Sequence, residues 1–202
     1  MSISARGYLN HLHNYLDIPT YGKTCLAGGC KNIKSNQIIL SEKIEGTGIR
    51  RKVLLEFSGE AFAVRLDQGK NPLFHFLKTQ GHPWGRRCDF VIFHAVNNSL
   101  KVYCIEFKEA STRIPLDKAH LQLKSAEAWC KSLNKIVSAY IGDTKTLNLT
   151  KYLFTACKNP NPDLGANNQY LSRYPSIRHY LFDEVDGQNL SFLTNSAVTT
   201  IR

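Results

Sequence analysis

Two carboxyl groups and one amino group, those of Asp89, Glu106 and Lys108, stand in two neighbouring apolar runs of the sequence. Carboxylate oxygens are the ligands that hard divalent cations such as Mg²⁺ prefer. A lysine beside such a cation can stabilise negative charge that develops during a reaction. Whether these three groups can act together depends on the elements that position them.

The two apolar runs, 89–93 and 100–108, flank the pair Asn97-Asn98. Asparagine tolerates the positive φ that both central residues of a two-residue turn require, so the sequence predicts a β-hairpin. In that register the two carboxylates face each other, with Cβ atoms about 4.5–5.5 Å apart. The lysine lies on the same face, about 7 Å further along its strand. The sequence therefore predicts a pocket for a divalent cation with a cationic neighbour.

An Asp at the start of one strand, Glu-x-Lys at the end of the next and a following helix resemble the PD-(D/E)xK phosphodiesterase superfamily. This superfamily includes restriction endonucleases, junction resolvases and bacterial defence nucleases. The matching residues are Asp89, Glu106 and Lys108, with Gln122 on the following helix as a fourth. One departure is that Arg87-Cys88, without a proline, precedes the aspartate. The resemblance implies an α/β fold with a restriction-endonuclease-like core, a central mixed β-sheet flanked by helices.

The resemblance also implies a metal-dependent nuclease that hydrolyses phosphodiester bonds of nucleic acid, DNA being favoured, in bacterial defence, restriction or repair. Its cofactor would be Mg²⁺, for which Mn²⁺ could substitute. The implied ligands are Asp89, Glu106 and the backbone carbonyl of Phe107, and Lys108 would orient water or stabilise developing charge. Many relatives carry one more acid upstream, and the candidates here are Glu56, Glu60 and Asp67.

The loop before Asp89 carries Arg86 and Arg87, a guanidinium pair that suits a phosphate group. Both arginines could equally neutralise Asp89 or the surface. Gln122 is open to two interpretations as well, one beside metal and phosphate and one facing solvent.

Two other interpretations of the whole motif remain open. In the first, the protein is a catalytically inactive nucleic-acid-binding module on the same scaffold. In the second, the hairpin is ordinary structure in which Asp89 and Glu106 are each paired with an arginine or a lysine. Metal binding would exclude the second.

The composition favours a polyanionic partner. The 202 residues include 26 Lys and Arg against 16 Asp and Glu, a formal net charge of +10, although the excess is spread along the chain. Because the chain shows no separate target-recognition domain, we expect a homodimer or a partner protein to supply specificity. It has no membrane-spanning apolar run and no signal-peptide pattern, so we expect a cytoplasmic protein without a membrane partner. The six cysteines are expected to be free thiols, and a zinc site at Cys25 and Cys30 is not expected.

The length predicts a single domain over 1–202, which the resemblance implies is nuclease-like. It consists of an N-terminal helix and loop extension (1–50), a core (61–157) and a C-terminal loop and hairpin (158–202). Helices are expected over 5–17 and from Ile114-Pro115 to about Lys135. A hairpin is expected from 53–57 and 61–67, and a late one from 178–183 and 190–193. The other expected short apolar or strand segments are 37–40, 73–77, 136–141 and 151–157.

Overall fold

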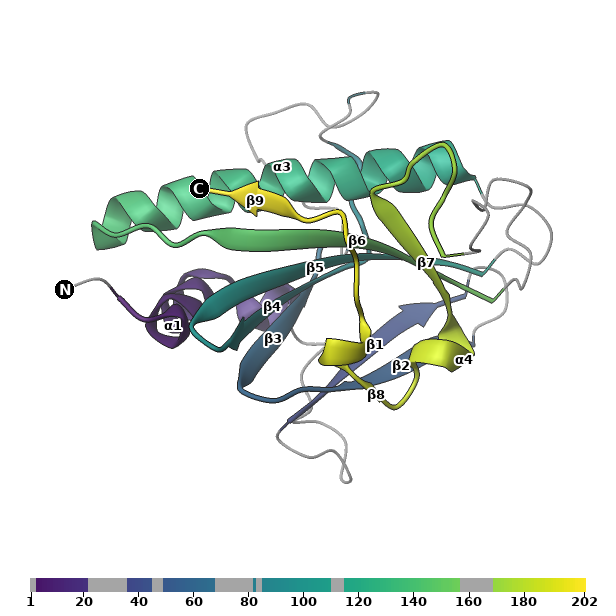
Figure 1. Cartoon of the computed structure of the whole chain (residues 1–202), viewed down its shortest axis with the longest axis horizontal. Helices are drawn as coiled ribbons and strands as arrows, with labels where there is room; N and C mark the ends of the chain where they lie inside the picture. Colours follow the sequence, from purple (N-terminus) through teal and green to yellow (C-terminus); the bar gives the residue numbers. More distant parts are fainter. Residues whose placement is uncertain are drawn as a thin grey trace.

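The computed structural model describes residues 3–21, 36–44, 49–67, 82, 85–109, 115–156 and 169–202. Its described elements form three layers (Figure 1). A six-stranded mixed sheet lies in the middle, and helices α1 (Ala5–Tyr15) and α3 (Leu116–Ile141) cover one of its faces. A three-stranded sheet packs against the other face. The fold is thus mixed α/β, with a mixed multi-strand sheet and flanking helices.

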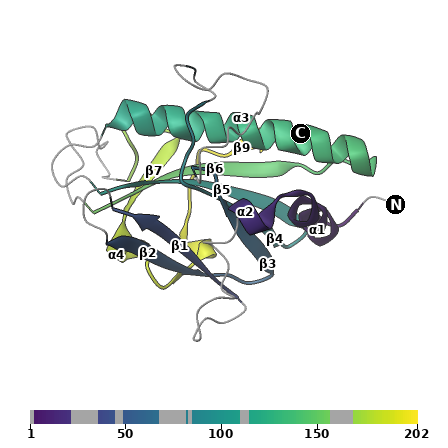
Figure 2. The same ribbon diagram turned by 180° about the vertical axis from the view of Figure 1, so that it is seen from behind.

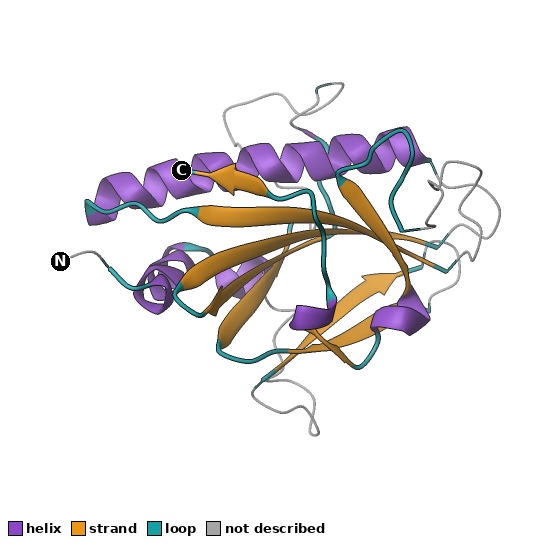
Figure 3. Ribbon diagram, in the orientation of Figure 1, coloured by secondary structure: helices purple, strands orange, loops and turns teal. Residues whose placement is uncertain are grey.

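The strands of the central sheet are coloured orange in Figure 3. Three antiparallel strands come first in space, and two parallel strands continue the sheet. In spatial order they are β3 (Glu60–Arg65), β4 (Phe90–Val96), β5 (Ser99–Lys108), β6 (Leu147–Thr155) and β7 (Ile177–Leu181). A short strand, β9 (Thr199–Ile201), pairs antiparallel with the start of β6.

The predicted hairpin between β4 and β5 is confirmed, including its register. Asn97 and Asn98 have φ values of 49° and 56°, the left-handed backbone that this turn requires. Val96 pairs with Ser99 at the turn, and Phe90 pairs with Ile105 at the other end of the ladder. One step further, the same register places Asp89 opposite Glu106.

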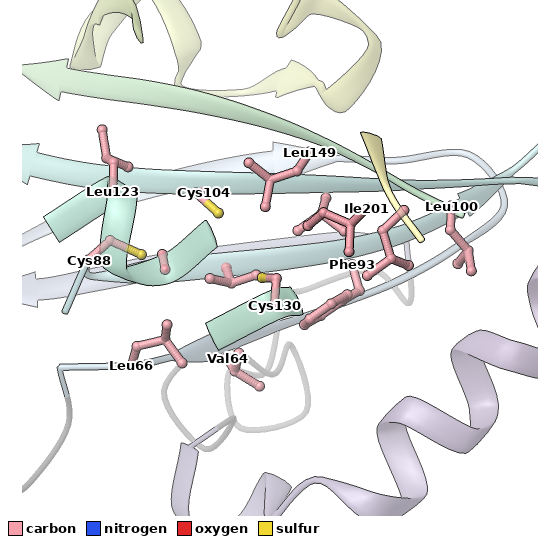
Figure 4. Close-up of a cluster of buried hydrophobic side chains, with 14 of the residues drawn as sticks. Val64, Leu66, Cys88, Phe93, Leu100, Cys104, Leu123, Cys130, Leu149 and Ile201 are labelled. Carbon is pink, nitrogen blue, oxygen red and sulfur yellow. The ribbon is translucent and has the colours of Figure 1, made fainter. Parts of the chain in front are cut away.

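Side-chain alternation along β5 divides the apolar residues between the two faces of the sheet. Val102 and Cys104 face the helices, whereas Tyr103 and Ile105 face the three-stranded sheet. Figure 4 shows the helix-side cluster, in which Cys130 of α3 lies among residues of the strands. Any polar residue that continues the helix-side row of β5 therefore lies beneath α3.

Helix α3 begins with the expected signals, but it is longer than predicted, and its last turn lies beyond Lys131 and Lys135. Pro115 precedes it, Asp117 lies in its first turn, and Gly142 ends it with φ 68°. The strand predicted over 136–141 is wrong, because the helix continues to Ile141. Val137 is buried there as the next member of the helical stripe. A short apolar run with β-branched residues suits either element, and packing on the sheet decides between them.

The second sheet consists of β1 (Gln37–Lys43), β2 (Arg50–Glu56) and β8 (Gln188–Asn189). The hairpin predicted from 53–57 and 61–67 is wrong, because β2 pairs with β1 and β3 pairs with β4. The chain turns from one sheet into the other at Ser58-Gly59, where Gly59 has φ 82°. The Ser58 carbonyl oxygen lies 2.6 Å from Nε2 of His94, which ties this corner to β4.

The late hairpin is also wrong. Strand β7 pairs in parallel with β6, and the chain then forms the short helix α4 (Phe182–Val185), β8 and a 3₁₀ turn, η3 (Leu190–Phe192). The C-terminal part therefore extends both sheets. At the other end of the chain, α2 (Ile18–Tyr21) follows α1 and contacts β3 (Figure 2).

Three cysteines, Cys88, Cys104 and Cys130, are free and buried, as expected. Cys25, Cys30 and Cys157 lie outside the described residues, as does the apolar piece over 73–77. No helix in the described part of the chain combines the length and the apolar character needed to cross a membrane.

Candidate functional site

Asp89 and Glu106 lie at adjoining ends of β4 and β5, on the face that α3 covers. Both are buried, with exposed fractions of 3% and 0%. Oδ2 of Asp89 accepts a hydrogen bond of 2.6 Å from the backbone N–H of Phe107, which fixes that carboxyl group against the next strand. Glu106 thus lies within β5, and Asp89 lies directly before β4.

Lys108 and Gln122 join the two acids. The Lys108 ammonium donates to Oε1 of Glu106 and lies 3.3 Å from Oε1 of Gln122. The Gln122 amide in turn donates to the carbonyl oxygen of Arg87 at 2.8 Å. Gln122 therefore connects α3, the end of β5 and the segment before Asp89. The four residues that the motif singled out lie together, and the amide of Gln122 faces the site.

Two further carboxylates, from Glu42 and Asp67, reach the same place. Carboxylate oxygens of Glu42, Asp67 and Asp89 all lie within 4.8 Å of one another. Asp67 follows β3, whereas Glu42 comes from β1 in the other sheet. Glu106 interacts electrostatically with all three acids, so we call Glu42, Asp67, Asp89 and Glu106 the four-carboxylate cluster.

Of the three candidate upstream acids, Asp67 belongs to the cluster and the other two have different partners. Oε1 of Glu56 accepts from Gln37 at 2.7 Å, and Glu60 forms an ion pair with Arg6 at 2.5 Å. Sequence reasoning missed Glu42. Ile38, Leu40 and Glu42 lie on one face of β1, and the first two are buried, so the alternation pointed to Glu42. The expected strand over 37–40 ended before this residue.

Burial and mutual repulsion disfavour the ionised forms of Glu42, Asp89 and Glu106. Burial raises the pKa of Glu106 to about 7; Lys108 opposes this, and Glu42 and Asp67 add to it. Burial raises the pKa of Asp89 well above its usual range, as do the charges of Glu106, Glu42 and Asp67. Burial and Asp67 raise the pKa of Glu42 to about 6, against the opposing charges of Arg65 and Lys108. The neutral, protonated form of these three carboxyl groups is thus favoured unless a cation binds between them.

The donor set fits a hard divalent cation. Oε2 of Glu106 is buried and has no hydrogen-bond partner among the described residues. A buried carboxylate oxygen without a partner is costly, and a bound cation would satisfy it. All the side-chain donors in the four-carboxylate cluster are oxygen atoms, which is the ligand chemistry of Mg²⁺ and Mn²⁺.

A recess of about 560 Å³ opens beside the cluster, lined by Asp67, Gly85, Arg86, Arg87, Lys118 and Gln122. Arg86 is exposed, and the Arg87 guanidinium donates to the carbonyl oxygen of Leu66 at 3.4 Å. The nearby Arg65 pairs with Asp67 at 2.6 Å. The recess therefore lies between the four-carboxylate cluster and three basic side chains, those of Arg86, Arg87 and Lys118. Lys118 was not expected from the sequence.

Comparison of the chain with protein-family models, with curated proteins and with solved structures gives no match. The functional argument therefore depends on the geometry of the site.

Proposed function

We propose that this protein is a metal-dependent nuclease with a restriction-endonuclease-like core that hydrolyses phosphodiester bonds of nucleic acid, DNA being favoured. The observation that carries the proposal is the buried Glu106, whose Oε1 accepts from Lys108 while Oε2 lacks a partner in the described structure. Glu106 interacts electrostatically with three more carboxylates and follows Ile105, the partner of Phe90 at the end of the hairpin ladder. This arrangement fits the Asp and Glu-x-Lys pattern that the sequence resembles.

Asp89 and Glu106, with the backbone carbonyl of Phe107, would hold the cation, and Asp67 and Glu42 would complete its oxygen ligands. A divalent cation at such a site lowers the pKa of bound water and polarises a phosphoryl oxygen. Mg²⁺ is the proposed cofactor, and Mn²⁺ should substitute for it.

The basic residues act on the substrate. Arg86, Arg87 and Lys118, which line the recess, bind phosphate groups of the strand next to the scissile bond. The Lys108 ammonium stabilises the charge that develops on the phosphoryl oxygens. Gln122 keeps Lys108 and the arginine-bearing segment at a fixed separation, because its amide bonds to both.

The test is cleavage of end-labelled single- and double-stranded DNA and RNA, with Mg²⁺, with Mn²⁺ and with a chelator. We expect metal-dependent cleavage by the parent protein. Lys108→Ala should lower turnover by orders of magnitude while binding of substrate changes little, since Lys108 acts on the transition state.

Glu42→Gln tests the ligand that the sequence alone did not reveal, and Glu56→Gln is its matched control on the neighbouring strand. We expect Glu42→Gln to reduce metal-dependent cleavage and Glu56→Gln to leave it unchanged. Binding of nucleic acid without cleavage under any metal would contradict the proposal and support an inactive binding module.

A further inference from the structure

The Lys108 side chain binds the carboxylate that the proposed cation also needs. Its ammonium contacts Oε1 of Glu106, the most deeply buried acid of the four-carboxylate cluster. Ammonium and divalent cation are both positive, so they repel each other when both lie against one carboxylate. The Lys108 ammonium and an external divalent cation would therefore compete for the Glu106 carboxylate.

Lys108 has a second acceptor within reach. Oε1 of Gln122 lies 3.3 Å from its ammonium nitrogen, on the α3 side of the pocket. The other end of the Gln122 amide donates to the Arg87 carbonyl oxygen, so this acceptor is held in place. A lysine displaced from Glu106 thus keeps a hydrogen-bond partner without leaving the buried site.

We propose that Lys108 is the resident counter-cation of the four-carboxylate cluster, that a divalent cation displaces it from Glu106, and that Gln122 then holds it. The inference rests on the proposed function, because it takes the cluster as the metal site. It assigns Gln122 as a positioning residue that acts through Lys108. The same movement places the ammonium beside the recess that Arg86, Arg87 and Lys118 line, where the substrate phosphate would lie.

The test is a titration of the parent protein and of its variants with Mn²⁺ alone, in which electron paramagnetic resonance measures the concentration of free Mn²⁺. It needs no substrate and no turnover. Lys108→Met removes the competing charge, so Mn²⁺ should bind about tenfold more tightly or better, the size expected for a neighbouring unit charge. Lys131→Met is the matched control, because Lys131 also pairs with a glutamate, Glu127 at 2.7 Å, on the exposed face of α3. It should leave Mn²⁺ affinity unchanged.

Gln122→Leu removes the second acceptor and should weaken Mn²⁺ binding by roughly tenfold, since a displaced ammonium then lacks a partner. If Gln122 acts through Lys108, the double variant Lys108→Met/Gln122→Leu should bind Mn²⁺ as tightly as Lys108→Met alone. This non-additivity would not arise from a purely structural role of Gln122.

The outcomes separate this inference from the proposed function. If Mn²⁺ binds the parent but Lys108→Met binds it no more tightly, the counter-cation role is wrong and the metal site stands. If Gln122→Leu weakens binding equally in both backgrounds, the role of Gln122 as acceptor for Lys108 is wrong. If Mn²⁺ does not bind the parent, both proposals fail. Lys108→Met leaves the buried Glu106 without its ion pair, and this variant could fail to fold. In that case Gln122→Leu still tests the inference, because unchanged Mn²⁺ affinity in this variant would contradict it.

Discussion

At the scale of single residues, the site places several acids where few cations oppose them. The four-carboxylate cluster is buried or half-buried, and the charges of Arg65 and Lys108 oppose those of its acids. A structure that keeps buried acids so close needs protons or a cation to compensate them. Their repulsion is therefore a measurable quantity.

Asp89→Asn should relieve part of this repulsion. The asparagine oxygen can still accept from the Phe107 N–H, so the metal-free variant should melt at the same temperature as the parent or up to about 2–4 °C higher. Millimolar Mg²⁺ should raise the melting temperature of the parent, because a ligand that binds only the folded state stabilises it. It should raise that of the variant far less.

The measurement is a set of thermal melts in chelator-treated buffer, with and without Mg²⁺. Asp183→Asn, which changes an exposed aspartate of α4, is the control and should respond to Mg²⁺ as the parent does. An equal metal shift in the Asp89→Asn variant would show that Asp89 is not a ligand.

At the scale of elements, two turns with positive φ have different roles. Asn97-Asn98 closes a hairpin within one sheet, whereas Ser58-Gly59 passes the chain from β2 in one sheet to β3 in the other. The second turn lies against the end of β4. A Cβ added at Gly59 would come within 2.5 Å of the Ala95 carbonyl oxygen.

Gly59→Ala should therefore be more destabilising than Gly142→Ala. Both glycines have positive φ, at 82° and 68°, and an added Cβ costs about 1–2 kcal/mol in that conformation. A Cβ at Gly142 meets nothing within 4 Å, so the backbone strain is its whole cost. The clash at Gly59 should add about 1–3 kcal/mol. Urea denaturation of both variants measures the difference, and equal losses would mean that the corner between the sheets relaxes freely.

At the scale of the whole molecule, the site lies where the three layers meet. Strand β5 of the central sheet contributes Glu106 and Lys108, and the residue directly before β4 is Asp89. The second sheet contributes Glu42, and α3 contributes Gln122. A chain with a formal net charge of +10 surrounds this acidic centre, and basic side chains line the adjoining recess. Under the proposed function, the basic surface would attract the substrate and the four-carboxylate cluster would be the place of cleavage.

If phosphate contacts drive this attraction, binding of nucleic acid should weaken with salt. The logarithm of affinity should fall linearly with the logarithm of salt concentration, with a slope near −0.7 to −0.9 per phosphate contact. Arg86→Glu should weaken binding more than Lys135→Glu, which changes an exposed lysine of α3 away from the recess. Fluorescence titration of labelled nucleic acid with the metal-free protein, in the presence of a chelator, measures both effects. A flat salt response would contradict a nucleic-acid partner.

The parts of the fold that depend on neighbours along the chain could be predicted from the sequence. Two consecutive asparagines accept the positive φ of the turn, and side chains of a strand alternate with a period of two, so the register of β4 and β5 and the facing of Asp89 and Glu106 followed. The start of α3 and most of its buried stripe followed in the same way from helical spacing.

The contacts between segments far apart in the sequence could not be predicted, because they depend on the packing of the whole molecule. Turn residues at Ser58-Gly59 do not specify whether the flanking strands pair with each other, and burial of both sheet faces selected β1 and β4 as their partners. The end of α3 and the parallel pairing of β7 were likewise settled by packing. The position of Glu42 in the site and the contact of Gln122 with Lys108 have the same origin. Contacts between residues far apart in the sequence depend on which surfaces the whole molecule buries, and no local sequence pattern encodes this.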